Sequence, residues 1–69
     1  MRVMEIQLNG EPRIVDANSS VSDLLHAEGL AERRVAIEVN GQIVPRAQHA
    51  SQRLQAGDRI EIVHALGGG

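Results

Sequence analysis

Residues 57–69 read Gly57-Asp58-Arg59-Ile60-Glu61-Ile62-Val63-His64-Ala65-Leu66-Gly67-Gly68-Gly69, which combines a turn, an alternating segment and a run of three glycines. Apolar Ile60 and Ile62 alternate with charged residues, and this period of two is typical of a half-buried strand. We expect both isoleucines to face a core, whereas Val63 and Ala65 lie on the opposite face and leave it partly apolar. The sequence therefore predicts a core strand that runs directly into a glycine tail.

The tail of Gly67, Gly68 and Gly69 has no side chains and can follow a channel too narrow for larger residues. A C-terminal carboxyl group has a pKa near ~3.5, so the carboxylate of Gly69 is an unreactive anion at neutral pH. Acyl chemistry at this group requires activation by another enzyme. The alternative is a frayed chain end without a function.

All basic residues of the chain are arginines, and there is no lysine and no cysteine. An acyl group activated at Gly69 would therefore meet no strong side-chain nucleophile in its own chain, because arginine stays protonated. Only the N-terminal amine remains. A codon bias toward arginine explains the composition equally well, but the chemical consequence is the same.

With 69 residues and no Phe, Tyr or Trp, the chain predicts one small domain with an aliphatic core. We expect this domain to span residues 1–66 and a flexible tail to span residues 67–69. Without cysteine there are no disulfides or thiolate metal sites, and without an apolar leader or a long apolar run we expect a cytoplasmic protein. The net charge of -2 argues against nucleic acid as the main partner.

The N-terminal residues predict a pair of antiparallel strands. Alternating apolar residues over 4–8 indicate the first strand, and Asn9-Gly10 is a strong hairpin signal because both residues accept a positive φ. A two-residue loop would place Leu8 opposite Glu11 on one face, so we expect a bulge or a longer loop. Pro12 should confine the return strand to a sheet edge.

A short helix is predicted next, because Val21, Leu24 and Leu25 share one helical face. Ser20 and Asp23 form a variant of the capping box at its start. Gly29 should end the helix in a left-handed cap, after which Leu30 folds back against the last turn.

A second strand pair follows the helix. Apolar residues alternate over 35–39, and Asn40-Gly41 repeats the hairpin signal before Ile43 and Val44. Pro45 interrupts this pair, and residues 46–55 show no clear periodicity apart from Leu54 before the Ala56-Gly57-Asp58 turn.

This order of elements resembles the β-grasp, ubiquitin-like fold, an α+β fold with a mixed sheet of four to five strands on one short helix. The chain is more specifically similar to the sulfur carrier family of thiamine biosynthesis, the ThiS family, over essentially its whole length. The matching stretches are Ile6-Gln7-Leu8-Asn9-Gly10, Val21-Ser22-Asp23-Leu24-Leu25, Glu38-Val39-Asn40-Gly41-Gln42-Ile43-Val44-Pro45-Arg46 and residues 57–69.

The resemblance implies a protein co-substrate rather than an enzyme. In that family a ThiF-type adenylyltransferase uses ATP to adenylate the terminal carboxylate, here that of Gly69. A cysteine desulfurase or related donor then supplies the sulfur that displaces AMP and leaves a thiocarboxylate. A ThiG-type thiazole synthase receives this sulfur. The family resemblance further implies that Gly67 and Gly68 enter the partners' channels while Val63, His64, Ala65 and Leu66 dock on the partner surface.

Two other functions are consistent with the residues. One is the small subunit of molybdopterin synthase, a carrier with the same fold and tail, and the other is a ubiquitin-like interaction module whose tail is never activated. A carrier role in tRNA thiolation also stays open. The Ile43-Val44-Pro45-Arg46 segment favours the thiamine pathway.

Other candidate chemistry is sparse. His26, His49 and His64 are too far apart in sequence to form a local metal motif, so we expect no metal and no bound cofactor. Arg33 and Arg34 suggest a solvated turn or a patch for an acidic partner, and Arg46 could anchor residues 46–55 by binding backbone carbonyls.

Overall fold

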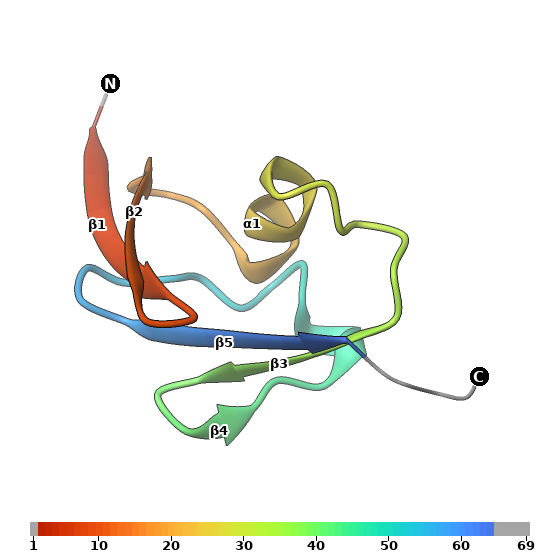
Figure 1. Cartoon of the computed structure of the whole chain (residues 1–69). Coiled ribbons are helices and arrows are strands. Elements are labelled where there is room, and N and C mark those ends of the chain that lie inside the picture. The colour runs from red at the N-terminus through yellow and green to blue at the C-terminus, as the bar shows by residue number, and fades with distance from the viewer. Residues whose placement is uncertain (1, 65–69) are drawn as a thin grey trace.

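The computed structural model describes residues 2–64 and shows a five-stranded mixed sheet with one α-helix packed on it (Figure 1). The strands lie in the order β2-β1-β5-β3-β4, so β5, the last strand, is the central one. The predicted β-grasp arrangement is confirmed. The predicted boundary at residue 66 and the tail lie outside the described residues. The elements are β1 (Val3–Leu8), β2 (Glu11–Asp16), α1 (Val21–Ala27), β3 (Val35–Val39), β4 (Gln42–Ile43), the 3-10 helix η1 (Arg46–Gln48) and β5 (Arg59–His64).

The β1–β2 hairpin closes with a two-residue loop, and the expected bulge is absent. Leu8 pairs directly with Glu11, and Asn9 and Gly10 have φ angles of 52° and 84°, as a type I′ turn requires. The register is tolerated because β2 is the edge strand, as Pro12 predicted. Leu8 is buried in the core while its partner Glu11 stays exposed at the rim.

Helix α1 is two turns long and is capped at both ends. The Ser20 side chain accepts a hydrogen bond from the backbone N–H of Asp23 at 3.0 Å, and the Asp23 carboxylate accepts one from the N–H of Ser20 at 2.9 Å. At the other end Gly29 has a φ of 75°, and the N–H of Leu30 donates to the carbonyl of Leu25 at 2.8 Å. These contacts form a capping box and a Schellman motif, as the sequence predicts.

Strands β3 and β4 form a second hairpin around Asn40 and Gly41, whose φ angles of 53° and 85° repeat those of the first turn. Pro45 ends β4 and precedes η1. The irregular segment is held differently from the sequence hypothesis. Arg53, rather than Arg46, binds a backbone carbonyl, with Nη1 2.6 Å from the oxygen of Asn18.

The core lies between the helix and one face of the sheet. Its most deeply buried side chains come from α1 and from the three central strands. Ile60 and Ile62 of β5 are both buried, so their predicted inward positions are confirmed. In residues 2–64 no helix is long and apolar enough to cross a membrane. The buried core residues are Ile6, Leu8, Val21, Leu24, Leu25, Ile37, Val39, Val44, Leu54, Ile60 and Ile62.

Candidate functional site at the end of the last strand

The site predicted from the sequence lies at the end of β5, of which the structure describes Val63 and His64. Val63 pairs with Ala36, lies on the face away from the helix and is 57% exposed. His64 pairs with Val35 on the helix side and is also exposed. The other predicted site residues, Ala65, Leu66, Gly67, Gly68 and Gly69, lie outside the described residues.

Strand β5 is held by β3 from Ile60 to His64 and by β1 only at its start. It pairs in parallel with β1 at Gln7 and Leu8 and antiparallel with β3 from Val35 to Val39. The ladder with β1 is short because β1 turns away at Asn9 while β5 continues. The last residues of β5 therefore need another partner on that side.

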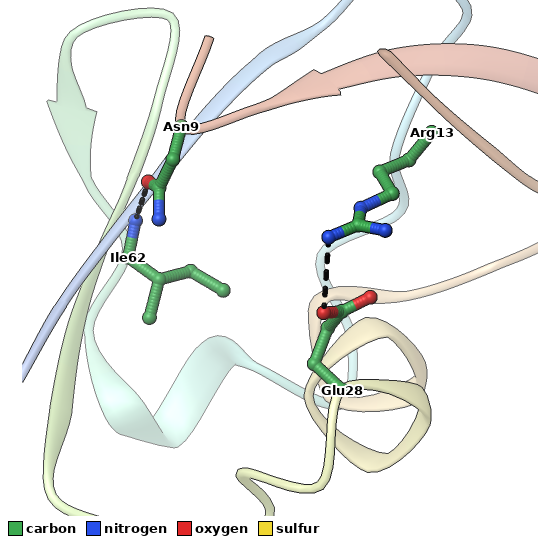
Figure 2. A network of polar contacts seen from close by, with 4 residues as sticks. All are labelled: Asn9, Arg13, Glu28 and Ile62. Carbon is green, nitrogen blue, oxygen red and sulfur yellow. Dashed lines mark hydrogen bonds and ion pairs between the residues drawn. The ribbon is translucent and has the colours of Figure 1, made fainter. Parts of the chain in front are cut away.

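Asn9 supplies this partner. Its backbone N–H donates to the carbonyl of Ile60 at 2.8 Å, and its side-chain Oδ1 accepts a hydrogen bond from the N–H of Ile62 at 2.9 Å. Figure 2 shows the Asn9 side chain extended across to β5 at this point. The side chain thus continues the parallel ladder for one step after β1 has ended, close to the predicted docking residues.

Asn40 does the same at the start of β5. Its N–H donates to the carbonyl of Arg59 at 2.7 Å, and its Oδ1 accepts from the N–H of Arg59 at 2.9 Å. Its Nδ2 also donates to Oδ1 of Asp58 at 3.0 Å, while the other oxygen of Asp58 accepts from the N–H of Gln55 at 2.8 Å. The asparagines of both Asn-Gly turns therefore fix the central strand.

Sequence reasoning used these two asparagines only as turn signals. Their second role was missed because hydrogen bonds that join residues 9 and 62, or 40 and 59, depend on the sheet order. The only sequence signal is weak: both turns begin with asparagine, which supplies a side-chain acceptor that glycine lacks.

A polar contact closes the helix-side rim of this region. Nη2 of Arg13, on the edge strand β2, lies 3.7 Å from Oε1 of Glu28 at the end of α1 (Figure 2). Both side chains are partly exposed, at 45% and 27%, so the ion pair contributes at most a few tenths of a kcal/mol. Arg13 and Glu28 line one pocket together with Leu30 and His64.

The outer face of the sheet carries exposed apolar side chains on both sides of β3. Ile43 of β4 is 61% exposed and pairs with Glu38, and Val63 of β5 pairs with Ala36. Exposed apolar residues that share one face of a sheet suit contact with another protein. The outward position of Val63 confirms the predicted alternation, whereas the exposure of Ile43 was not foreseen.

No group of three or more histidine or acidic residues that could hold a metal ion is present in residues 2–64. The three histidines are on α1, in the segment after η1 and on β5. What the geometry provides is a central strand that β3, Asn9 and Asn40 hold by hydrogen bonds.

The sequence model of the ThiS family matches residues 6–69, from the first core strand to the last glycine. The chain belongs to the ThiS family. As a ThiS-family protein it shares 33% identity with the sulfur carrier protein ThiS of Escherichia coli, over 96% of this chain and 100% of that protein.

This ThiS-family chain is also similar to part of larger proteins. It is 42% identical to a thiazole synthase of Magnetococcus marinus and 41% identical to one of Paramagnetospirillum magneticum, over 96% of this chain. It spans only 20% of the length of each of these two relatives.

The fold agrees with solved ThiS structures. The crystal structure of the thiamine biosynthesis protein ThiS from Geobacter metallireducens superposes with a TM-score of 0.82 at 32% identity, over 96% of this chain and 100% of that one. The solution structure of a thiamine biosynthesis protein from Geobacter metallireducens gives a TM-score of 0.76, over 96% and 88%.

Proposed function

We propose that this ThiS-family protein carries sulfur as a C-terminal thiocarboxylate on Gly69 for the synthesis of the thiazole ring of thiamine. Membership of a family that includes the sulfur carrier ThiS is the observation that carries the proposal. The central position of β5, held by Asn9 and Asn40, supports it because a carrier must present its reactive end from a fixed base.

The chemistry takes place on the terminal carboxylate. A ThiF-type adenylyltransferase joins the Gly69 carboxylate to the α-phosphorus of ATP, forming an acyl adenylate and releasing pyrophosphate. Sulfur at the oxidation level of sulfide then attacks the acyl carbon, AMP leaves, and the thiocarboxylate remains. A persulfide from a cysteine desulfurase serves equally if a thiol afterwards cleaves the acyl disulfide. The terminal carboxylate, which is a poor electrophile, is thereby converted to a thiocarboxylate, which is a sulfur nucleophile.

The protein is a co-substrate in this scheme and performs no catalysis itself. The thiocarboxylate delivers its sulfur to a thiazole synthase, and the carrier returns to the carboxylate form. The similarity to proteins named thiazole synthase supports this acceptor, since a carrier and its acceptor act in successive steps. The absence of lysine and cysteine protects the activated end from capture by the carrier's own side chains.

The predicted docking residues follow from the same scheme. Val63 and His64 would contact the partner surface, with Ala65 and Leu66 continuing the contact and Gly67 and Gly68 inside the channel. The exposure of Val63 and His64 supports this assignment. Replacing Gly68 by Val should block passage through a glycine-wide channel without altering the folded domain.

Intact-mass analysis tests the proposal. The protein is incubated with ATP, a cognate adenylyltransferase and a sulfur donor, and we expect a mass gain equal to the difference between sulfur and oxygen, located at Gly69 by fragmentation. Deletion of Gly69 should abolish the gain, and Gly68→Val should reduce it while the circular dichroism spectrum stays unchanged.

An unmodified end in the presence of an active adenylyltransferase would contradict the proposal and favour a ubiquitin-like binding module. Consumption of the thiocarboxylate by molybdopterin synthase but not by thiazole synthase would contradict the thiamine pathway. The intact mass of the protein isolated from cells shows whether Gly69 is its terminal residue, which the mechanism requires.

A further inference from the structure

Arginine side chains from two separate segments gather around one pocket, which we name the arginine pocket. Arg33 and Arg34 come from the loop between α1 and β3, Arg46 comes from η1, and His49 follows η1. The apolar part of the lining includes Leu25, Val35 and Ala36. Three of the seven basic residues of an otherwise acidic protein are therefore concentrated at one place.

The guanidinium groups of this pocket are available for an external partner. Within residues 2–64, Arg33, Arg34 and Arg46 are all exposed and form no ion pair and no side-chain hydrogen bond. Arg13 and Arg53, by contrast, are engaged with Glu28 and with the carbonyl of Asn18. Among the residues that the structure describes, none with an acidic side chain lines the pocket.

His49 helps to give the pocket a fixed wall. Its Nε2–H donates to the carbonyl of Val44 at 3.2 Å, which ties the histidine to the end of β4. The N–H of His49 donates to the carbonyl of Arg46 at 3.1 Å. The segment that carries Arg46 is thus anchored by backbone and histidine contacts, and the Arg46 side chain is not needed for this anchoring.

The arginine pocket adjoins the end of β5. Val35 and Ala36 line it, and these two residues pair with His64 and Val63. Paired residues of antiparallel strands have Cα atoms about 5 Å apart, so the wall of the pocket is next to the last described residue. In Figure 1 the end of β5 lies beside the segment that leads into β3, in agreement with the pairing of His64 and Val35.

The short distance along the chain between His64 and Gly69 requires a partner enzyme to lie close to the arginine pocket. Gly69 is five positions beyond His64, and an extended chain covers at most about 18 Å over that length. An enzyme that acts on Gly69 must therefore place the entrance of its active site against the surface around His64. The arginine pocket is part of that surface.

We propose that the arginine pocket binds an acidic surface at the active-site entrance of the adenylyltransferase that receives residues 65–69. The inference rests on the proposed function, which supplies the enzyme. It adds that the surface of this enzyme around the entrance carries negative charge. Exposed arginines suit carboxylates, which they bind in a bidentate manner. Charges at the rim of an interface mainly accelerate association and select the partner.

Nucleic acid and free phosphate fit the pocket less well. The protein has a net charge of -2 and no aromatic residue for base stacking. Phosphate sites are usually built from free backbone N–H groups, whereas the N–H of Arg33 already donates to the carbonyl of Leu30 at 3.0 Å. An acidic protein surface is the occupant that these observations favour.

The test measures association rates of the full chain with the cognate adenylyltransferase by stopped flow over a range of salt concentrations. The variant Arg34→Glu/Arg46→Glu reverses one charge in each segment, and Arg2→Glu/Arg59→Glu makes the same change in net charge elsewhere. We expect the first variant to associate about tenfold more slowly at low salt and to lose most of its salt dependence, and the control to change less than about twofold.

Equal effects of the two variants would show that only net charge matters, and unchanged rates in both would show no electrostatic docking; either result overturns the proposal. The milder variant Arg34→Gln/Arg46→Gln, expected to give an intermediate loss, covers the case in which charge reversal prevents folding. A wild-type association rate that is independent of salt also contradicts the proposal. Saturable binding of inorganic phosphate in the pocket, without competition by the enzyme, would identify a small-anion site instead.

Sulfur loading is measured on the same samples to separate the two proposals. If the wild-type protein is loaded and the arginine variant associates normally, the docking proposal fails and the proposed function stands. If the wild-type protein is not loaded although the arginine variant loses binding, the proposed function fails and the docking surface stands.

Discussion

Asn9 combines a conformational and a bonding role at one position. Its φ of 52° is in the left-handed region that asparagine tolerates better than most residues, and its Oδ1 accepts the hydrogen bond from the N–H of Ile62. Glycine would satisfy only the first requirement, and aspartate would satisfy both. The two roles can therefore be separated by substitution.

We expect Asn9→Gly to lower the free energy of unfolding by about 1–2 kcal/mol, because the N–H of Ile62 loses its acceptor while the turn stays unstrained. Asn9→Asp should lose less than half of that amount. Urea denaturation measures the loss, and hydrogen exchange should show faster exchange at Ile62. Unchanged stability and unchanged protection of Ile62 in Asn9→Gly would exclude this role.

The titration of Asp23 affects the stability of the fold. The hydrogen bond from the Ser20 backbone N–H, followed by that with the Ser20 side chain, holds the pKa of the Asp23 carboxyl below its usual value. The positive charge of Arg53 acts in the same direction with a smaller effect. The folded protein therefore favours the ionised form of Asp23.

The sign of the resulting pH dependence follows from the lowered pKa. Stability contributed by the Asp23 carboxylate is fully present above about pH 4, the usual range of an aspartate, and is lost as the pH falls through the folded-state pKa. Denaturation curves of the wild type and Asp23→Ala should differ most above that pH and converge in stronger acid. A constant difference at every pH would contradict this, and Glu5→Ala on the outer face controls for the loss of one acidic side chain.

At the level of secondary structure, α1 depends on its two ends. A helix of seven residues is too short to be stable alone in water, so it relies on its caps and on burial of Val21, Leu24 and Leu25. The C-terminal cap requires Gly29 at a φ of 75°, and Leu30 packs against the core directly after it. The cap thus connects the helix to the loop that carries Arg33 and Arg34.

We expect Gly29→Ala to destabilise the protein by about 1 kcal/mol. A Cβ at Gly29 would meet no atom within 4 Å, so the cost arises from the left-handed conformation and not from a clash. Gly29→Asn should cost less, because asparagine tolerates this conformation. Thermal denaturation followed by circular dichroism measures both, and equal losses for the two variants would indicate that something other than backbone conformation is responsible.

At the scale of the whole molecule, stability rests on one aliphatic core shared by α1 and the central strands. A domain of this length has a free energy of unfolding of roughly 3–10 kcal/mol. Ile37, fully buried on β3, faces this core. Loss of a single core side chain therefore removes a large share of the total.

We expect Ile37→Ala to cost about 2–5 kcal/mol and Ile37→Val about 1 kcal/mol. Urea denaturation must be followed by circular dichroism, because the chain has no aromatic residue to provide fluorescence. Val63→Ala, at an exposed position of β5, is the matched control and should change stability by less than about 0.5 kcal/mol. A loss in Ile37→Ala no larger than in this control would contradict the assigned core.

The local elements could be predicted because their signals are short in sequence. The two Asn-Gly turns, the capping box of Ser20 and Asp23, and the cap at Gly29 each depend on residues within a few positions of one another. The hairpin loop was the exception. The mismatch of Leu8 and Glu11 argued for a bulge, and only the edge position of β2 and its exposed rim make the direct register acceptable.

By itself the amino-acid sequence determined the strand, turn and helix signals, the aliphatic composition of the core, and the family resemblance centred on the last strand and its glycines. The tertiary structure decided that Asn9 and Asn40 hold β5 from both sides, and that arginines from two segments meet beside its end. The physical reason is the separation along the sequence of the residues that interact. Periodicity and capping act within a few residues, whereas these contacts form only when the sheet order brings distant segments together.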